Sequence, residues 1–130
     1  MIRIVVGITG PGGSEHDLSA VARALRDAGH EVVYAGEHQS PEQIVGTAIQ
    51  EDADLIALAV LGADCLAPYR RLLALLADQD ASDIAVVDVG VVAEQDVAVL
   101  QGMGVARLFA PGAPTSEIPA WVAEHFGADR

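Results

Sequence analysis

A glycine-rich stretch near the amino terminus has the residue types that hold cofactors in many α/β proteins. Residues 7–17 read GITGPGGSEHD, with four glycines and one proline after an apolar run. Glycines at the junction of a strand and a helix let backbone N–H groups approach a phosphate at the helix N-terminus. The stretch is therefore a candidate phosphate loop, and its remaining residues decide which ligand fits.

A missing cation argues against a mononucleotide site of the P-loop type. The stretch has the frame G-x-x-x-x-G, but Gly13 stands where a P-loop requires lysine. The chain contains no lysine, since its seven basic residues are all arginines. The same absence excludes a phospho-acceptor site of the receiver type. Such a site also needs acidic residues at the ends of two strands that here end GITG and AVLG.

A nucleotide-binding domain that uses Gly10–Ser14 and Glu37 stays open as an alternative. Residues 10–15, GPGGSE, begin like the dinucleotide fingerprint G-x-G-x-x-G. Glu37 follows the second expected strand, where a ribose-binding acid belongs. Glu15, however, takes the place of the third glycine and puts a carboxylate where the pyrophosphate approaches. A broken fingerprint of this kind is weak support for a nucleotide site.

Composition limits the partners and the compartment. The 130 residues suffice for one domain, which we expect to span 1–130. The formal charge of −12 argues against nucleic acid or an anionic membrane surface as a partner, because binding phosphates requires clustered cations. No apolar run is long enough to span a bilayer and no secretory segment is present, so we expect a soluble cytoplasmic protein. The single cysteine, Cys65, fits a reducing compartment. Association into a homo-oligomer stays open.

Five apolar runs alternate with five amphipathic stretches along the chain. The runs are short, mostly rich in Val and Ile, and bounded by turn residues, which predicts strands at 2–8, 31–36, 54–61, 83–92 and 106–110. Helices are expected at about 15–28, 41–52, 66–78, 94–102 and 115–126. Ser40 and Gln43 predict a capping box around Pro41, and Gly29 predicts the end of the first helix.

This alternation predicts an α/β fold with a doubly wound parallel sheet. Right-handed crossovers place helices on both faces of the sheet. A single flavodoxin-like (Rossmann-like) domain of five strands has the order 2-1-3-4-5, and its ligands bind at the carboxyl ends of the strands. The loops at that edge are 9–14, 61–65, 88–93 and 110–114.

Two segments resemble one known family. Residues 22–58, ARALRDAGHEVVYAGEHQSPEQIVGTAIQEDADLIAL, are very similar to the cobalamin-binding domain of coenzyme B12-dependent acyl-CoA mutases. They are most like the separate small subunit of the isobutyryl-CoA and methylmalonyl-CoA mutase group. Residues 109–118, FAPGAPTSEI, resemble the family's F-x-P-G segment, and the similarity extends over about residues 2–126. The resemblance implies adenosylcobalamin as cofactor, a mutase large subunit as partner, and no catalytic residue in this chain.

The family motif that supplies the cobalt ligand is altered here. The family's D-G-H-D-R-G falls on residues 12–17, GGSEHD, where Gly13 is kept. Gly12 replaces the backing aspartate and Ser14 replaces the histidine that ligates cobalt. In the family the carboxylate fixes the ring tautomer and raises the basicity of the ligating nitrogen. Serine offers neither, so the resemblance implies cobalamin binding that is weakened or lost.

Other family positions are kept in part. In the S-x-L motif, Leu61 is kept but Ala59 replaces the serine that contacts the displaced dimethylbenzimidazole base. In the glycine pair that makes room for the nucleotide tail, Val89 replaces the first glycine. The positions that the resemblance assigns to the cofactor site are Gly12, Gly13, Ser14, Ala59, Leu61, Val89, Gly90, Phe109, Pro111 and Gly112. The alternative within the family is a cobalamin-free relative that acts as a protein-interaction subunit. The sequence predicts no separate metal site, because no His or Cys spacing of a known type is present.

Overall fold

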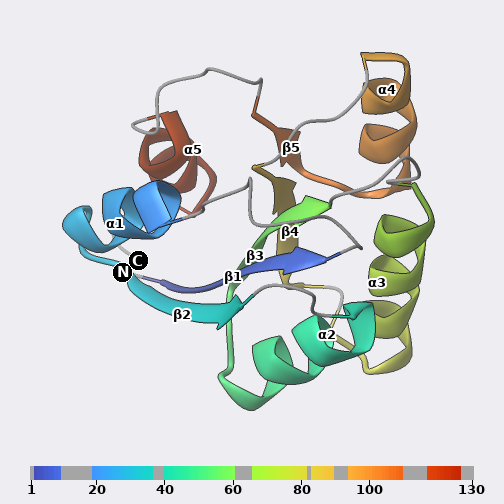
Figure 1. The fold of residues 1–130 in the computed structure, drawn as a ribbon, viewed down its shortest axis with the longest axis horizontal. Helices are drawn as coiled ribbons and strands as arrows, with labels where there is room; N and C mark the ends of the chain where they lie inside the picture. The colour runs from blue at the N-terminus through green and yellow to red at the C-terminus, as the bar shows by residue number, and fades with distance from the viewer. Residues whose placement is uncertain are drawn as a thin grey trace.

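Strands and helices alternate along the chain as the apolar runs predict (Figure 1). The computed structural model describes residues 2–9, 19–36, 40–60, 66–81, 83–89, 94–109 and 117–126. The strands are β1 (Arg3–Thr9), β2 (Glu31–Gly36), β3 (Leu55–Val60), β4 (Ala85–Asp88) and β5 (Arg107–Leu108). The helices are α1 (Ser19–Asp27), α2 (Pro41–Gln50), α3 (Leu66–Asp78), α4 (Glu94–Met103) and α5 (Glu117–Phe126).

The five strands form one parallel sheet in the order β2-β1-β3-β4-β5, which confirms the predicted order 2-1-3-4-5. The central strand β3 is buried over its whole length, because helices cover both of its faces. Its run LIALAV is accordingly continuous in apolar residues rather than alternating with polar ones.

The helices form two layers. In Figure 1, α1 and α5 lie on one side of the sheet, and α2, α3 and α4 lie on the other. Two separate clusters of buried side chains follow from this arrangement. One cluster joins the sheet to α1 and α5, through Val21, Leu25, Ile118 and Val122 among others, and is called the α1/α5 layer below. The second joins the sheet to α2, α3 and α4 and is called the α2/α3/α4 layer.

Two predicted helix ends are confirmed, the start of α2 at its capping box and the end of α1 at Gly29, whereas α2 ends at Gln50 rather than at residue 52. Gln43 N–H donates to Ser40 Oγ at 3.1 Å and Ser40 N–H donates to Gln43 Oε1 at 2.8 Å, which completes the capping box of α2. Gly29, at φ +95°, follows α1, and the next amide, that of His30, donates to Leu25 O at 3.1 Å. This is the bond pattern of a helix that ends in a left-handed residue, where glycine avoids a Cβ clash.

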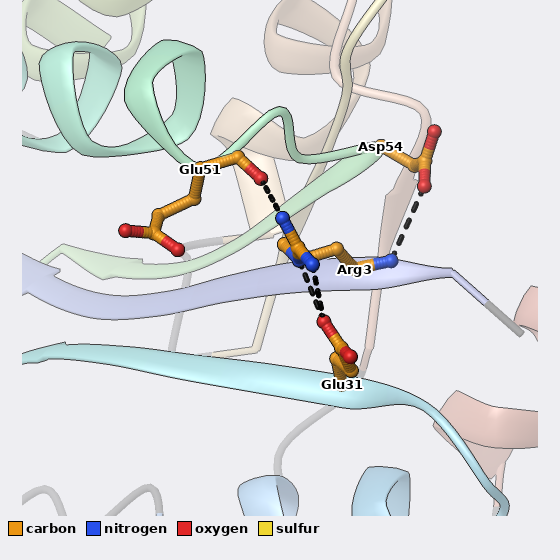
Figure 2. Close-up of polar contacts among 4 residues, drawn as sticks. All are labelled: Arg3, Glu31, Glu51 and Asp54. Carbon is orange, nitrogen blue, oxygen red and sulfur yellow. Dashed lines mark hydrogen bonds and ion pairs between the residues drawn. The ribbon is translucent and has the colours of Figure 1, made fainter.

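A single arginine joins three elements at the amino-terminal edge of the sheet, opposite the ligand edge (Figure 2). Arg3 Nε donates to Glu31 Oε2 at 2.7 Å, and Arg3 Nη1 donates to the backbone oxygen of Glu51 at 2.6 Å, just past α2. The carboxylate of Asp54 accepts from Arg3 N–H at 3.2 Å. The hydrogen bond to Glu31 and its charge raise the pKa of the Arg3 guanidinium. The contact fixes the relative positions of β1, β2 and the turn into β3.

Two strands are shorter than the sequence predicts. The run 83–92 predicted one strand, but β4 begins at Ala85 and ends at Asp88. The run 106–110 predicted five residues, whereas β5 pairs only through Arg107 and Leu108. Strand β5 is an edge strand and can pair only where β4 offers hydrogen-bond partners. Apolar composition alone does not set the length of either strand. Among the described helices none is both long and apolar enough to cross a bilayer.

Candidate functional site

Three of the predicted site residues lie at the carboxyl ends of three neighbouring strands. Ala59 is the penultimate residue of β3, Val89 directly follows β4, and Phe109 directly follows β5. The Val89 amide donates to Leu58 O at 2.9 Å, and the Phe109 amide donates to Asp88 O at 3.0 Å. The sheet therefore brings together residues that are 20 to 50 positions apart in sequence, at the edge where ligands bind in this fold.

The same three residues also share one face of the sheet. Ala59 and Phe109 belong to the buried cluster of the α1/α5 layer, and Val89 packs against it. Because side chains alternate along a strand, Ala57 and Val87 point to the same layer two residues earlier. A ligand group that entered here would have to pass between the sheet and helices α1 and α5.

The three side chains at this part of the edge are apolar and mostly buried. Ala59 is 0 % exposed and Phe109 is 6 % exposed, and Val89 is half-buried. None of the three side chains carries a hydrogen-bonding group. The three positions can therefore offer a ligand shape and van der Waals contact, but no polar recognition.

Aromatic side chains brace Phe109 from α5. The rings of Phe109 and Trp121 meet edge to face, with centroids 6.3 Å apart. Trp121 in turn stacks on His125 at 4.5 Å, and the guanidinium of Arg107 lies 5.4 Å from the centre of the Phe109 ring. Trp121 thus packs between α5 and the sheet, against the cluster of the α1/α5 layer. These contacts hold the Phe109 ring in place beside the candidate site.

The other predicted positions lie outside the described residues. They are Gly12, Gly13, Ser14, Leu61, Gly90, Pro111 and Gly112. The residues of the nucleotide alternative, Gly10–Ser14 and Glu37, also lie outside them. Their assignment to a site therefore stays a prediction from the sequence.

Two hollows of the surface lie away from this edge. A groove of about 320 Å³ runs between α2 and α3, with Val45, Ile49 and Leu75 in its wall. A polar pocket of about 260 Å³ lies at the amino-terminal edge of the sheet. Asp52 and Asp54, which follow α2, and Asp80, which follows α3, line it. Within the ranges that the structure describes, no three His, Cys, Asp or Glu side chains are grouped to hold a metal ion.

Sequence reasoning missed a buried polar contact at the ligand edge. Asp88 was expected in the loop 88–93, but it ends β4 and is 1 % exposed. Its side chain points to the α2/α3/α4 layer, where the Tyr69 hydroxyl donates to it. An aspartate in an otherwise apolar strand run is the only signal in the sequence that could have indicated such a contact.

The sequence is similar to curated small subunits of acyl-CoA mutases. A family model described as the B12 binding domain matches residues 2–119. The 2-hydroxyisobutanoyl-CoA mutase small subunit of Aquincola tertiaricarbonis is 36 % identical over 117 residues, which are 90 % of this chain and 86 % of that protein. The pivalyl-CoA mutase small subunit of Xanthobacter autotrophicus is also 36 % identical over 117 residues, 90 % of this chain and 78 % of that protein.

The fold is similar to that of a solved cobalamin-binding protein from Desulfitobacterium hafniense. The two superpose with a TM-score of 0.72 at 20 % identity, over 95 % of this chain and 58 % of the other. At that identity the superposition establishes a shared fold, and the ligand of the neighbour is a property of that protein alone.

Proposed function

Because the chain belongs to the B12-binding domain family, we propose that it is the small, cofactor-domain subunit of a two-subunit acyl-CoA mutase, in which cobalamin is held weakly or not at all. A separate large subunit would hold the acyl-CoA. Cobalamin, when bound, supplies the radical chemistry, and the protein supplies binding and orientation. This chain is not catalytic alone.

The apolar, buried packing of Ala59 and Val89 at the ligand edge is the observation that supports weakened binding. Ala59 is fully buried and has no hydroxyl where the family's serine contacts the base of cobalamin. Val89 places a branched side chain against the α1/α5 layer, where the family has a glycine. The described residues therefore do not fit the base-binding mode that the resemblance implies.

The identity of Ser14 supports the same conclusion from the sequence. A histidine that ligates cobalt needs its ring nitrogen and a carboxylate behind it, and residues 12 and 14 are Gly and Ser. Four positions, Gly12, Ser14, Ala59 and Val89, thus depart from the family in the same direction. A corrinoid would retain only the contacts of the glycines and of the loop that follows β5.

Corrinoid retention tests the proposal. The purified protein is mixed with hydroxocobalamin or adenosylcobalamin, desalted, and measured by visible absorbance. We expect little or no corrinoid to stay with the protein. A variant with Gly12→Asp, Ser14→His, Ala59→Ser and Val89→Gly restores the family residues and should retain corrinoid. The matched control carries Ser14→Ala with the other three changes, and it should retain less because it lacks the imidazole.

Stoichiometric corrinoid on the unchanged protein would overturn the weakened binding. A restored variant that folds but stays colourless would refute the account of the vacated positions. The role as a subunit is tested separately, by co-elution of the protein with an acyl-CoA mutase large subunit on size exclusion. Co-elution without corrinoid would favour the cobalamin-free interaction subunit. A thermal shift with NAD or ATP, in the absence of any corrinoid effect, would instead favour the nucleotide alternative.

A further inference from the structure

Asp88 is a buried acid in an apolar part of the molecule. It is 1 % exposed. Among the described residues that are buried, Asp88 alone is polar or charged, and the rest are hydrophobic. A carboxyl group that leaves water costs free energy unless it is hydrogen-bonded. Tyr69 of α3, itself 0 % exposed, supplies that bond: its hydroxyl donates to Asp88 Oδ1 at 2.5 Å. The two side chains thus form a pair inside the α2/α3/α4 layer.

The pair lies where four elements meet. The Tyr69 hydroxyl is also 3.2 Å from Leu58 O, near the carboxyl end of β3. That same oxygen accepts the Val89 amide, and Asp88 O accepts the Phe109 amide. Side-chain and backbone bonds around Asp88 therefore link α3 and β3 to β4 and to the residue after β5. A tyrosine hydroxyl has one proton, and the shorter distance assigns it to Asp88.

The pair holds the strand from the side opposite the candidate site. Asp88 points to the α2/α3/α4 layer, and the next residue, Val89, packs against the α1/α5 layer. A one-residue slip at this point would exchange the two side chains between the layers. Such a slip would bury Val89 away from the site and bring a carboxyl group into it.

We propose that Tyr69 and Asp88 are a positioning pair that fixes the carboxyl end of β4 and so keeps Val89 and Phe109 in place at the ligand edge. Apolar contacts are non-directional, whereas a hydrogen bond inside the core specifies one arrangement of its partners. β4 has four residues and β5 has two, so few ladder bonds hold this side of the sheet. The hydrogen bond between Tyr69 and Asp88 fixes the position of the carboxyl end of β4, which the few ladder bonds of the short strands fix less firmly. The inference rests on the proposed function only in naming this edge as the ligand edge.

Amide hydrogen exchange on the protein alone tests the pair. The amides of Val89 and Phe109 report the ligand edge, and those of Ala85 and Ala106 report the amino-terminal ends of the same region. Tyr69→Phe removes the hydroxyl and keeps the ring. It should speed exchange at Val89 and Phe109 by about fivefold more than at Ala85 and Ala106, since one hydrogen bond has a net strength of about 1 kcal/mol.

Two further variants separate positioning from stability. Asp88→Asn keeps an oxygen that accepts from Tyr69, so exchange at Val89 and Phe109 should stay near that of the unchanged protein. Tyr69→Phe with Asp88→Val replaces both polar groups by apolar ones, so we expect the double variant to fold. Its Val89 and Phe109 amides should still exchange faster than the reference amides, because the directional contact is gone.

Equal acceleration at all four amides in Tyr69→Phe would overturn the proposal, because the pair would then act only on global stability. Unchanged exchange in the double variant, or Asp88→Asn exchanging as fast as Tyr69→Phe, would overturn it as well. None of these measurements uses a corrinoid. An unexpected result in the corrinoid retention experiment would therefore count against the proposed function alone. The hydrogen-exchange measurements would still test the Tyr69–Asp88 pair.

Discussion

Ala59→Ser tests whether the ligand edge is closed in the folded protein. The methyl group of Ala59 is 0 % exposed and lies in the apolar cluster of the α1/α5 layer. Serine adds one hydroxyl to that cluster, and the resemblance assigns this hydroxyl to a base that the ligand-free protein does not contain. The new polar group would therefore be buried without the partner that the family provides for it.

The cost follows from the burial. A hydroxyl buried without a hydrogen bond destabilises proteins by about 1–3 kcal/mol. An unfolding entropy of about 2.1 cal/mol/K per residue makes each kcal/mol worth roughly 4 °C of Tm in a chain of 130 residues. We therefore expect Ala59→Ser to lower Tm by roughly 4–12 °C.

The assay is urea unfolding followed by far-ultraviolet circular dichroism, with thermal unfolding beside it. A lower midpoint with an unchanged m-value would report lost stability rather than a different denatured state. Ala57→Ser is the matched control, because Ala57 is also 0 % exposed and faces the same layer two residues from the edge. Both substitutions should cost about the same free energy of unfolding.

A neutral Ala59→Ser beside a costly Ala57→Ser would refute the reasoning. That result would mean that water or open space reaches Ala59, so that the edge is a cavity ready for a ligand. The closed packing would then no longer support weakened cobalamin binding. Equal costs would instead support an edge sealed by its own side chains.

Two further predictions concern regions away from this edge. Asp52 and Asp80 have φ of +56° and +59°, in the left-handed region that glycine adopts without strain. Asp80→Gly should raise the free energy of unfolding by up to about 1 kcal/mol and Asp80→Ala should lower it, as measured by urea unfolding. Burial lowers the pKa of His30, whose Nδ1 accepts from the Ile2 amide at 3.2 Å. The folded state therefore binds fewer protons than the unfolded state, and stability should be fully present above the unfolded value of about 6.5 and fall as pH drops below it. His30→Gln should flatten that slope, and an unchanged slope would show that another group is responsible.

The local elements of the fold could be predicted from the sequence. The capping box at Ser40, the end of the first helix at Gly29 and the limits of the helix at 66–78 depend on neighbouring residues, and all three are confirmed. The strand order is also confirmed, because five β-α units with right-handed crossovers allow few arrangements. These features follow from short-range patterns and from chain connectivity.

The candidate site could be predicted only in part. The sequence placed Ala59, Val89 and Phe109 at the ligand edge through a family resemblance, and the structure puts all three at the ends of adjacent strands. The sequence did not show that they share one face or that their side chains are buried in one apolar cluster. Both properties depend on the register between strands and on how α1 and α5 pack, which no local pattern encodes.

Residue types and their order alone determined the family, the alternation of elements and the absence of lysine-dependent phosphate chemistry. Only the tertiary structure decided where β4 and β5 end, that Asp88 faces Tyr69 across 19 residues of chain, and that Arg3 meets the carbonyl of Glu51 across 48. The physical reason is that a hydrogen bond or a packed contact depends on distance in space. Chain folding sets that distance for residues far apart in sequence, whereas caps and periodicity are set within one or two turns.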